Sequence, residues 1–89
     1  MKDIQSIQTL DRLRPGESAT VVDMEVGGSM RRRFLDIGLI PNTRVECVGR
    51  SPAGDPSAYL ICGALIAIRA RDCRGIRVRR NEEVDASWV

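Results

Sequence analysis

Three cysteines are the residues of this chain with the most versatile chemistry. Cys47, Cys62 and Cys73 are widely spaced, form no Cys-x-x-Cys pair, and are accompanied by no histidine in the 89 residues. A soft-metal site would have to gather four ligands from scattered thiols and a carboxylate, and ferrous iron would also need nitrogen or oxygen ligands. We therefore predict no metal site and expect Cys47 and Cys62 to be small buried side chains.

The sequence also offers no catalytic constellation. It contains no histidine and no visible pairing of a nucleophile with a base. It has no glycine-rich loop that ends in Lys-Ser or Lys-Thr before a helix, so nothing indicates nucleotide binding. We predict a binding module with no catalytic residues and no cofactor.

Arginine supplies all but one of the 14 positive charges, and two groups of arginines could form a binding surface. Arg31 to Arg33 would fan over about 200° of a helical wheel, so they cannot all face one ligand, and a solvated helix face is favoured over a dedicated docking patch. Arg69, Arg77 and Arg79 lie at outward strand positions. If their strands are neighbours, they form one positive surface for an acidic protein, a phosphate or RNA.

Nucleic acid is the disfavoured partner. The net charge is only +2, and the chain has one Phe, one Tyr and one Trp. Phe34 belongs to a predicted core stripe, which leaves Tyr59 and Trp88 as the stacking platforms. We expect no nucleic-acid partner.

One short helix is predicted at Ser29–Ile37, between the first two strands. Met30, Phe34 and Ile37 form its apolar stripe, and Ser29 is expected to cap it. Gly38 and Asn42, on either side of Pro41, are expected to take left-handed conformations that end the helix and turn the chain.

Short β-strands account for most of the remaining pattern. They are predicted at residues 18–24, 43–49, 57–62, 64–69 and 75–79, with a loop at 51–56 and a turn or short helical turn at 70–74. Residues 1–9 form a lead-in and 81–89 an acidic flexible tail that contains Trp88. We predict one α+β, mainly β domain over residues 10–80, a small antiparallel barrel of about five strands with one inserted helix.

The expected core draws on every predicted element. Val21 and Met24 can share a face only if the first strand is bulged. The candidates are Val21, Met24, Phe34, Ile37, Leu39, Val45, Cys47, Leu60, Ile66, Ile68, Ile76 and Val78.

The chain is expected to be cytoplasmic. It has no apolar run near the ~18 residues that span a bilayer, and its first residues lack a charged-then-apolar leader. The odd number of cysteines argues against a disulfide framework and favours a reducing compartment.

Five segments together resemble FeoA-type proteins, small cytosolic components of bacterial ferrous-iron uptake. They are residues 10–17 (LDRLRPGE), 32–41 (RRFLDIGLIP), 54–56 (GDP), and 66–69 (IAIR) before 75–78 (GIRV). Asn42 departs from the family, which usually has Gly after the proline. The resemblance implies an SH3-like fold and an adaptor that binds FeoB, a membrane transporter with a cytosolic GTP-binding domain.

The same resemblance leaves an alternative open. The module also ends some iron-dependent repressors, so the chain could be a stand-alone SH3-like regulatory domain that binds proline-rich or acidic segments. For docking on a transporter, exposure and predicted shape select Arg31, Arg32 and Leu39 around the helix exit, with Asp55 at a loop tip.

Overall fold

The computed structural model describes residues 7–81. In chain order the elements are β1 (Ile7–Thr9), the short 3-10 helix η1 (Leu10–Arg12), β2 (Ser18–Met24), α1 (Gly28–Asp36), β3 (Arg44–Arg50), β4 (Ser57–Ile61), β5 (Ala64–Ile68), α2 (Ala70–Cys73) and β6 (Ile76–Arg80). The predicted tail with Trp88, apart from Asn81, lies outside the described residues.

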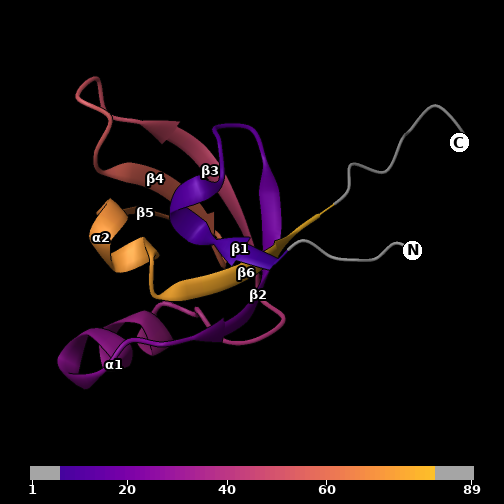
Figure 1. Ribbon diagram of the computed structural model, residues 1–89, viewed down its shortest axis with the longest axis vertical. Helices are drawn as coiled ribbons and strands as arrows, with labels where there is room; N and C mark the ends of the chain where they lie inside the picture. Colours follow the sequence, from indigo (N-terminus) through magenta and orange to yellow (C-terminus); the bar gives the residue numbers. More distant parts are fainter. Residues whose placement is uncertain (1–6, 82–89) are drawn as a thin grey trace, which may run out of the picture.

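One antiparallel sheet contains all six strands, in the order β1-β6-β2-β3-β4-β5 (Figure 1). Among residues 7–81, β1 and β5 are not paired with each other, so the sheet is open and each is an edge strand. The mainly β prediction with one helix inserted between the first two long strands is confirmed, but there are six strands rather than about five. The additional strand is β1, which pairs with β6. The prediction assigned its residues to the lead-in, because three residues are too few to show an alternation of apolar and polar side chains.

A bulge in β2 resolves the conflict between Val21 and Met24. The register with β6 shifts between Val21 and Asp23, so Val22 is the extra residue. Val21 then lies opposite Val78 and Met24 opposite Ile76, and both contact the core. The condition under which Val21 and Met24 can share a face, a bulge in this strand, is therefore met.

Eleven of the twelve predicted core residues belong to the core. Met24, Ile37 and Ile66 are partly buried and pack against it, and eight others are buried. The prediction that Leu60 belongs to the core is wrong, because 39% of the residue is exposed. Six further residues are buried that the sequence pattern did not predict: Leu10, Leu13, Ala19, Tyr59, Ile61 and Cys73.

The β4–β5 hairpin explains the error at Leu60. Its two-residue turn is Cys62-Gly63, with φ of 50° and 83°, and Ile61 pairs with Ala64 across it. This register points Tyr59 and Ile61 inward and leaves Leu60 and Cys62 exposed. The strand is apolar in both phases, so its alternation could not select the buried face.

Two further expectations fail with that hairpin. Cys62 is exposed rather than buried, because it lies in the turn itself. Tyr59 is no stacking platform, because only 1% of it is exposed and its hydroxyl donates to the carbonyl oxygen of Leu10 at 3.4 Å. Cys47 is buried as predicted.

α1 begins one residue earlier than predicted. Gly27 occupies its N-cap position without a side-chain hydrogen bond, so Ser29 lies inside the first turn and is not the cap. The exit is as expected, with φ of 101° at Gly38 and 78° at Asn42. A Cβ atom on Gly38 would lie 2.5 Å from Cys62 Sγ, so the helix exit contacts the β4–β5 turn closely.

Candidate partner-binding surface

The outer face of α1 carries two of the predicted docking residues. Arg31 and Arg32 are both exposed. With Gly28, Leu35 and Asp36 they line a shallow depression of about 310 Å³. Phe34 on the opposite side of α1 is buried, so the amphipathic pattern separates an exposed face from a packing face.

Leu39 does not contribute to this surface. The residue is 0% exposed, and its N–H donates to the carbonyl oxygen of Phe34 at 3.0 Å. The left-handed turn at Gly38 folds Leu39 back under the helix, so its expected exposure is wrong and its alternative place in the core is confirmed. The exposed apolar side chains at the helix exit are Leu35 and Ile40.

Asp55 lies far from α1. In Figure 1 the β3–β4 loop that carries Asp55 is at the top of the molecule and α1 is at the bottom. The side chain is exposed, and its Oδ1 accepts a hydrogen bond from the N–H of Ala70 at 2.8 Å, which ties the loop to the start of α2. Arg31, Arg32, Leu39 and Asp55 therefore do not form one surface.

The second arginine group is also dispersed. β5 and β6 are not neighbours in the sheet, so Arg69 does not extend a surface with Arg77 and Arg79. Arg77 Nε lies 2.7 Å from Asp23 Oδ1, and its Nη1 lies 3.2 Å from Glu25 Oε1. These two carboxylates offset the positive charge of Arg77, which the sequence analysis counted as part of one positive surface.

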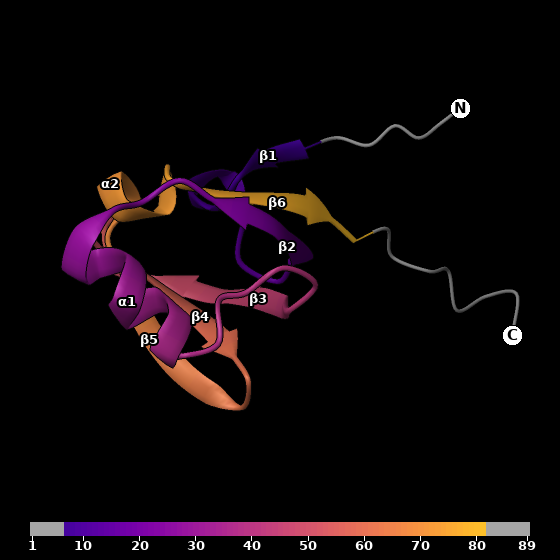
Figure 2. The same ribbon diagram turned by 90° about the horizontal axis from the view of Figure 1, so that it is seen from below.

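In Figure 2, α1, β5 and α2 lie on the same side of the molecule. A groove lies between these three elements. Its volume is about 410 Å³, within the ~300–1,000 Å³ range of ligand sites. One wall is the apolar stripe of α1, and the other is the edge strand. The lining residues are Met30, Arg33, Phe34, Ile37, Ile66, Ala67, Ile68, Arg69, Arg71 and Asp72.

Sequence reasoning missed this groove. The helical stripe at Met30, Phe34 and Ile37 was found, but it was assigned wholly to the core. Only Phe34 of the three is fully buried. The partial exposure of the other two follows from the position of β5 at the sheet edge, which no local pattern encodes.

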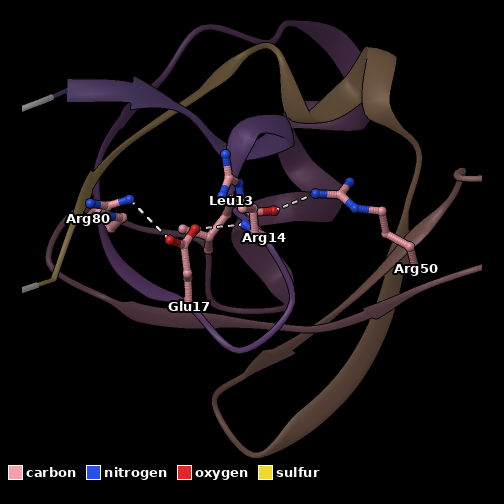
Figure 3. Close-up of polar contacts among 5 residues, drawn as sticks. All are labelled: Leu13, Arg14, Glu17, Arg50 and Arg80. Carbon is pink, nitrogen blue, oxygen red and sulfur yellow. Dashed lines mark hydrogen bonds and ion pairs between the residues drawn. The ribbon is translucent and has the colours of Figure 1, made fainter. Parts of the chain in front are cut away.

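A polar cluster lies where the turn after η1 meets the sheet (Figure 3). Arg50 Nη2 donates to the carbonyl oxygen of Leu13 at 2.7 Å, and its Nη1 donates to Ser57 Oγ at 3.0 Å. Glu17 accepts from the N–H of Arg14 at 2.9 Å and from Arg80 Nη1 at 3.0 Å. These bonds hold the turn against β3, β4 and β6, a structural role.

Cys73, the last residue of α2, and Tyr59 on β4 form a buried pair. Cys73 Sγ lies 3.5 Å from the Tyr59 hydroxyl. Burial raises the pKa of Cys73 to about 11 and raises the pKa of Tyr59 above its ordinary value of 10. Both groups are neutral near pH 7, so this thiol is a packing group rather than a reactive one.

Residues 7–81 contain neither a metal-binding cluster nor a membrane-spanning helix. In this part of the chain, no group of three or more Cys, Asp or Glu side chains could hold a metal ion. No described helix has the length and apolar character needed to cross a membrane.

Known structures share the fold. The chain is similar to the FeoA protein from Chlorobium tepidum, with a TM-score of 0.80, 26% identity, and coverage of 89% of this chain and 75% of that one. It is also similar to iron(II) transport protein A from Clostridium thermocellum, with a TM-score of 0.78, 32% identity, and coverage of 82% and 45%.

Two more distant structures are similar in fold alone. The zinc-complexed FeoA of Stenotrophomonas maltophilia, described as an SH3 domain protein, has a TM-score of 0.72 at 23% identity, over 80% of this chain and 88% of that one. A manganese-dependent transcriptional repressor has a TM-score of 0.76 at 20% identity, over 89% and 44%. The SH3-like fold prediction is confirmed.

Sequence comparison gives the same family. The chain is 30% identical over 69 residues to the Fe(2+) transport protein A/Fe(2+) transporter FeoB fusion protein of Porphyromonas gingivalis. That match covers 78% of this chain and only 8% of the relative. The FeoA domain family model matches residues 8–80, and the chain therefore belongs to the FeoA family.

Proposed function

We propose that this protein is a cytosolic accessory protein of bacterial ferrous-iron uptake that binds a FeoB-type transporter and catalyses no reaction. The observation that carries the proposal is the Porphyromonas gingivalis relative, in which a Fe(2+) transport protein A is fused to the transporter FeoB. Fusion keeps two units at a high effective concentration, an arrangement suited to units that bind each other.

The surface supports binding rather than chemistry. Arg31 and Arg32 project from a rigid helix beside the exposed Leu35, a combination of charged and apolar groups suited to a protein partner. The buried Cys73 is neutral and unavailable as a nucleophile. We propose no nucleic-acid partner and no bound cofactor.

Binding to the transporter is the direct test. A full-length FeoB-type transporter from the same organism, held in lipid nanodiscs, is immobilised and exposed to this chain in biolayer interferometry. Saturable binding is expected, and its absence would contradict the proposal.

Charge reversal then tests the outer face of α1. Arg31→Glu with Arg32→Glu should weaken binding at low salt by about tenfold or more, because each reversal replaces attraction with repulsion. Arg12→Glu with Arg44→Glu is the matched control, because it changes the net charge equally at exposed positions on other elements. Unchanged affinity in the first variant would remove the outer face of α1 from the docking surface.

The repressor-type alternative has fold similarity as its only support. The manganese-dependent repressor is 20% identical to this chain, so the match carries the fold and no function. We therefore put forward the transporter adaptor alone.

A further inference from the structure

The outer edge of β5 has unpaired backbone groups. β5 pairs with β4 through the register that begins with Ile61 opposite Ala64, next to the two-residue turn. In such a hairpin the hydrogen-bonded pairs alternate with non-bonded pairs, so Leu65 and Ala67 direct their N–H and C=O groups away from β4. Within residues 7–81 neither residue has a recorded backbone partner on that side.

The groove at this edge accepts apolar side chains. Ile66 and Ile68 line it from β5, and Met30 and Ile37 face it from α1. Because side chains alternate along a strand, a segment added to β5 would direct every second side chain into this apolar space. The remaining side chains would point to the rim.

The rim is positively charged. Arg33, Arg69 and Arg71 are exposed at the groove, and Asp72 is the one acidic residue in its lining. No ion pair recorded within residues 7–81 involves any of the three arginines. Three guanidinium groups in this position complement carboxylates on a bound segment.

We infer that the groove between α1 and β5 binds an extended segment of a partner protein, in which apolar residues alternate with Asp or Glu, by adding it as a seventh strand beside β5. The inference deepens the proposed function and rests on it only for the identity of the protein that carries the segment. The chemistry of the segment follows from the free edge, the apolar lining and the rim.

A synthetic peptide tests the groove without the transporter. An acetylated and amidated decapeptide of alternating Glu and Val is titrated into the ¹⁵N-labelled full chain, with an alternating Lys and Val decapeptide as the charge control. The expected result is shifts of the Leu65 and Ala67 amides and slower hydrogen exchange at both, with the Lys peptide at least about tenfold weaker. Equal binding of the two peptides, or shifts confined to Arg31, Arg32 and Leu35, would overturn the inference.

Two variants separate backbone pairing from charge. Ala67→Pro removes an outward N–H that β4 does not use, so binding should weaken at least about tenfold, whereas Ala67→Val keeps that N–H and should bind normally. Arg33→Glu with Arg69→Glu should abolish detectable binding, and Arg12→Glu with Arg44→Glu should not. The charge pair decides the question if Ala67→Pro fails to give a folded amide spectrum.

The transporter assay then distinguishes two kinds of failure. If the wild type and the Ala67→Pro and Arg33→Glu/Arg69→Glu variants bind the transporter equally, the proposed function stands and the inference about the groove is wrong. If the peptide binds as described but the transporter does not bind at all, the groove is supported and the proposed function is wrong.

Discussion

Arginine has opposite roles at two places on this sheet. In the polar cluster of Figure 3, Arg50 donates to the carbonyl oxygen of Leu13 at 2.7 Å, and Arg80 donates to the Glu17 carboxylate at 3.0 Å. At the groove beside β5, Arg33 and Arg69 surround an apolar recess and have no recorded ion-pair partner within residues 7–81. The same residue type is structural where backbone carbonyls and carboxylates lie within reach, and remains available to a ligand where the sheet ends.

The sequence does not distinguish these two roles. Arg50 and Arg69 each come directly after or at the end of a β-rich run. Their different partners arise because β3 is an interior strand beside the η1 turn, whereas β5 is an edge. The comparison predicts that substitutions in the polar cluster reduce stability and that substitutions at the groove reduce binding.

The largest expected effect is alkaline loss of stability through Cys73, the buried last residue of α2. The folded pKa of about 11 exceeds the ordinary value of 9.0. Between these values the unfolded chain loses the proton and the folded chain keeps it, so the unfolded state binds fewer protons and stability falls as pH rises. The loss should reach about 2–3 kcal/mol between pH 9 and 11.

Urea unfolding followed by circular dichroism at pH 8, 9, 10 and 11 measures this loss. Cys73→Ala should be less stable at pH 8 and should show a shallower pH dependence. Tyr59 contributes in the same direction, because its pKa is also raised, so some dependence should remain. Identical slopes in the two proteins would show that Cys73 is not the group responsible.

Arg50→Ala should destabilise the fold by about 1–3 kcal/mol, because it removes two hydrogen bonds from a charged donor. The substitution leaves the buried Ser57 hydroxyl without this partner. Urea unfolding at pH 7 gives the value, with Arg44→Ala as an exposed control on the same strand. If Arg50→Ala lowers the free energy of unfolding no more than Arg44→Ala does, the hydrogen bonds of Arg50 do not stabilise the fold.

Glu17→Gln should cost about 0.5–1 kcal/mol, because it weakens a partly exposed ion pair and keeps an oxygen acceptor. The distance from Arg80 Nη1 to Glu17 Oε2 is 3.0 Å. The same unfolding experiment in low salt and in 1 M NaCl should show the difference from wild type shrinking, since salt screens the pair. A difference that does not change with salt would assign the loss to packing instead.

The smallest stability effect is expected at the groove. Arg33→Glu with Arg69→Glu should change the free energy of unfolding by less than about 0.5 kcal/mol, because both side chains are exposed and unpaired within the described residues. Thermal and urea unfolding of this variant provide the check. A loss comparable to that of Arg50→Ala would break the contrast between the two regions.

Much of the fold could be predicted from local pattern. Alternation in β3 selected Val45 and Cys47 as buried residues. The apolar pattern showed that Val21 and Met24 could share a face only in a bulged strand, and the structure contains that bulge. Left-handed conformations at Gly38 and Asn42 were also predicted, because turn chemistry depends on single residues. Prediction failed where a segment is apolar in both phases, as in β4, or too short to show a period, as in β1.

The candidate site could be predicted only in part. Arg31 and Arg32 were placed on an exposed helix face because helical periodicity is a local property. Leu39 and Asp55 were expected beside these arginines because of an assumed shape of the helix exit. In the structure Leu39 is buried, and Asp55 accepts a hydrogen bond from Ala70 at the start of α2. Each error concerns proximity between segments, which a single sequence does not encode directly.

The family, the mainly β class, the inserted helix and most of the core could be predicted before folding is considered, because each depends on residue type and short-range spacing. The edge strands, the pairing of individual arginines and the lining of the groove are properties of the folded chain alone. Those properties depend on the order of strands in the sheet, where hydrogen bonds join segments that are distant along the chain.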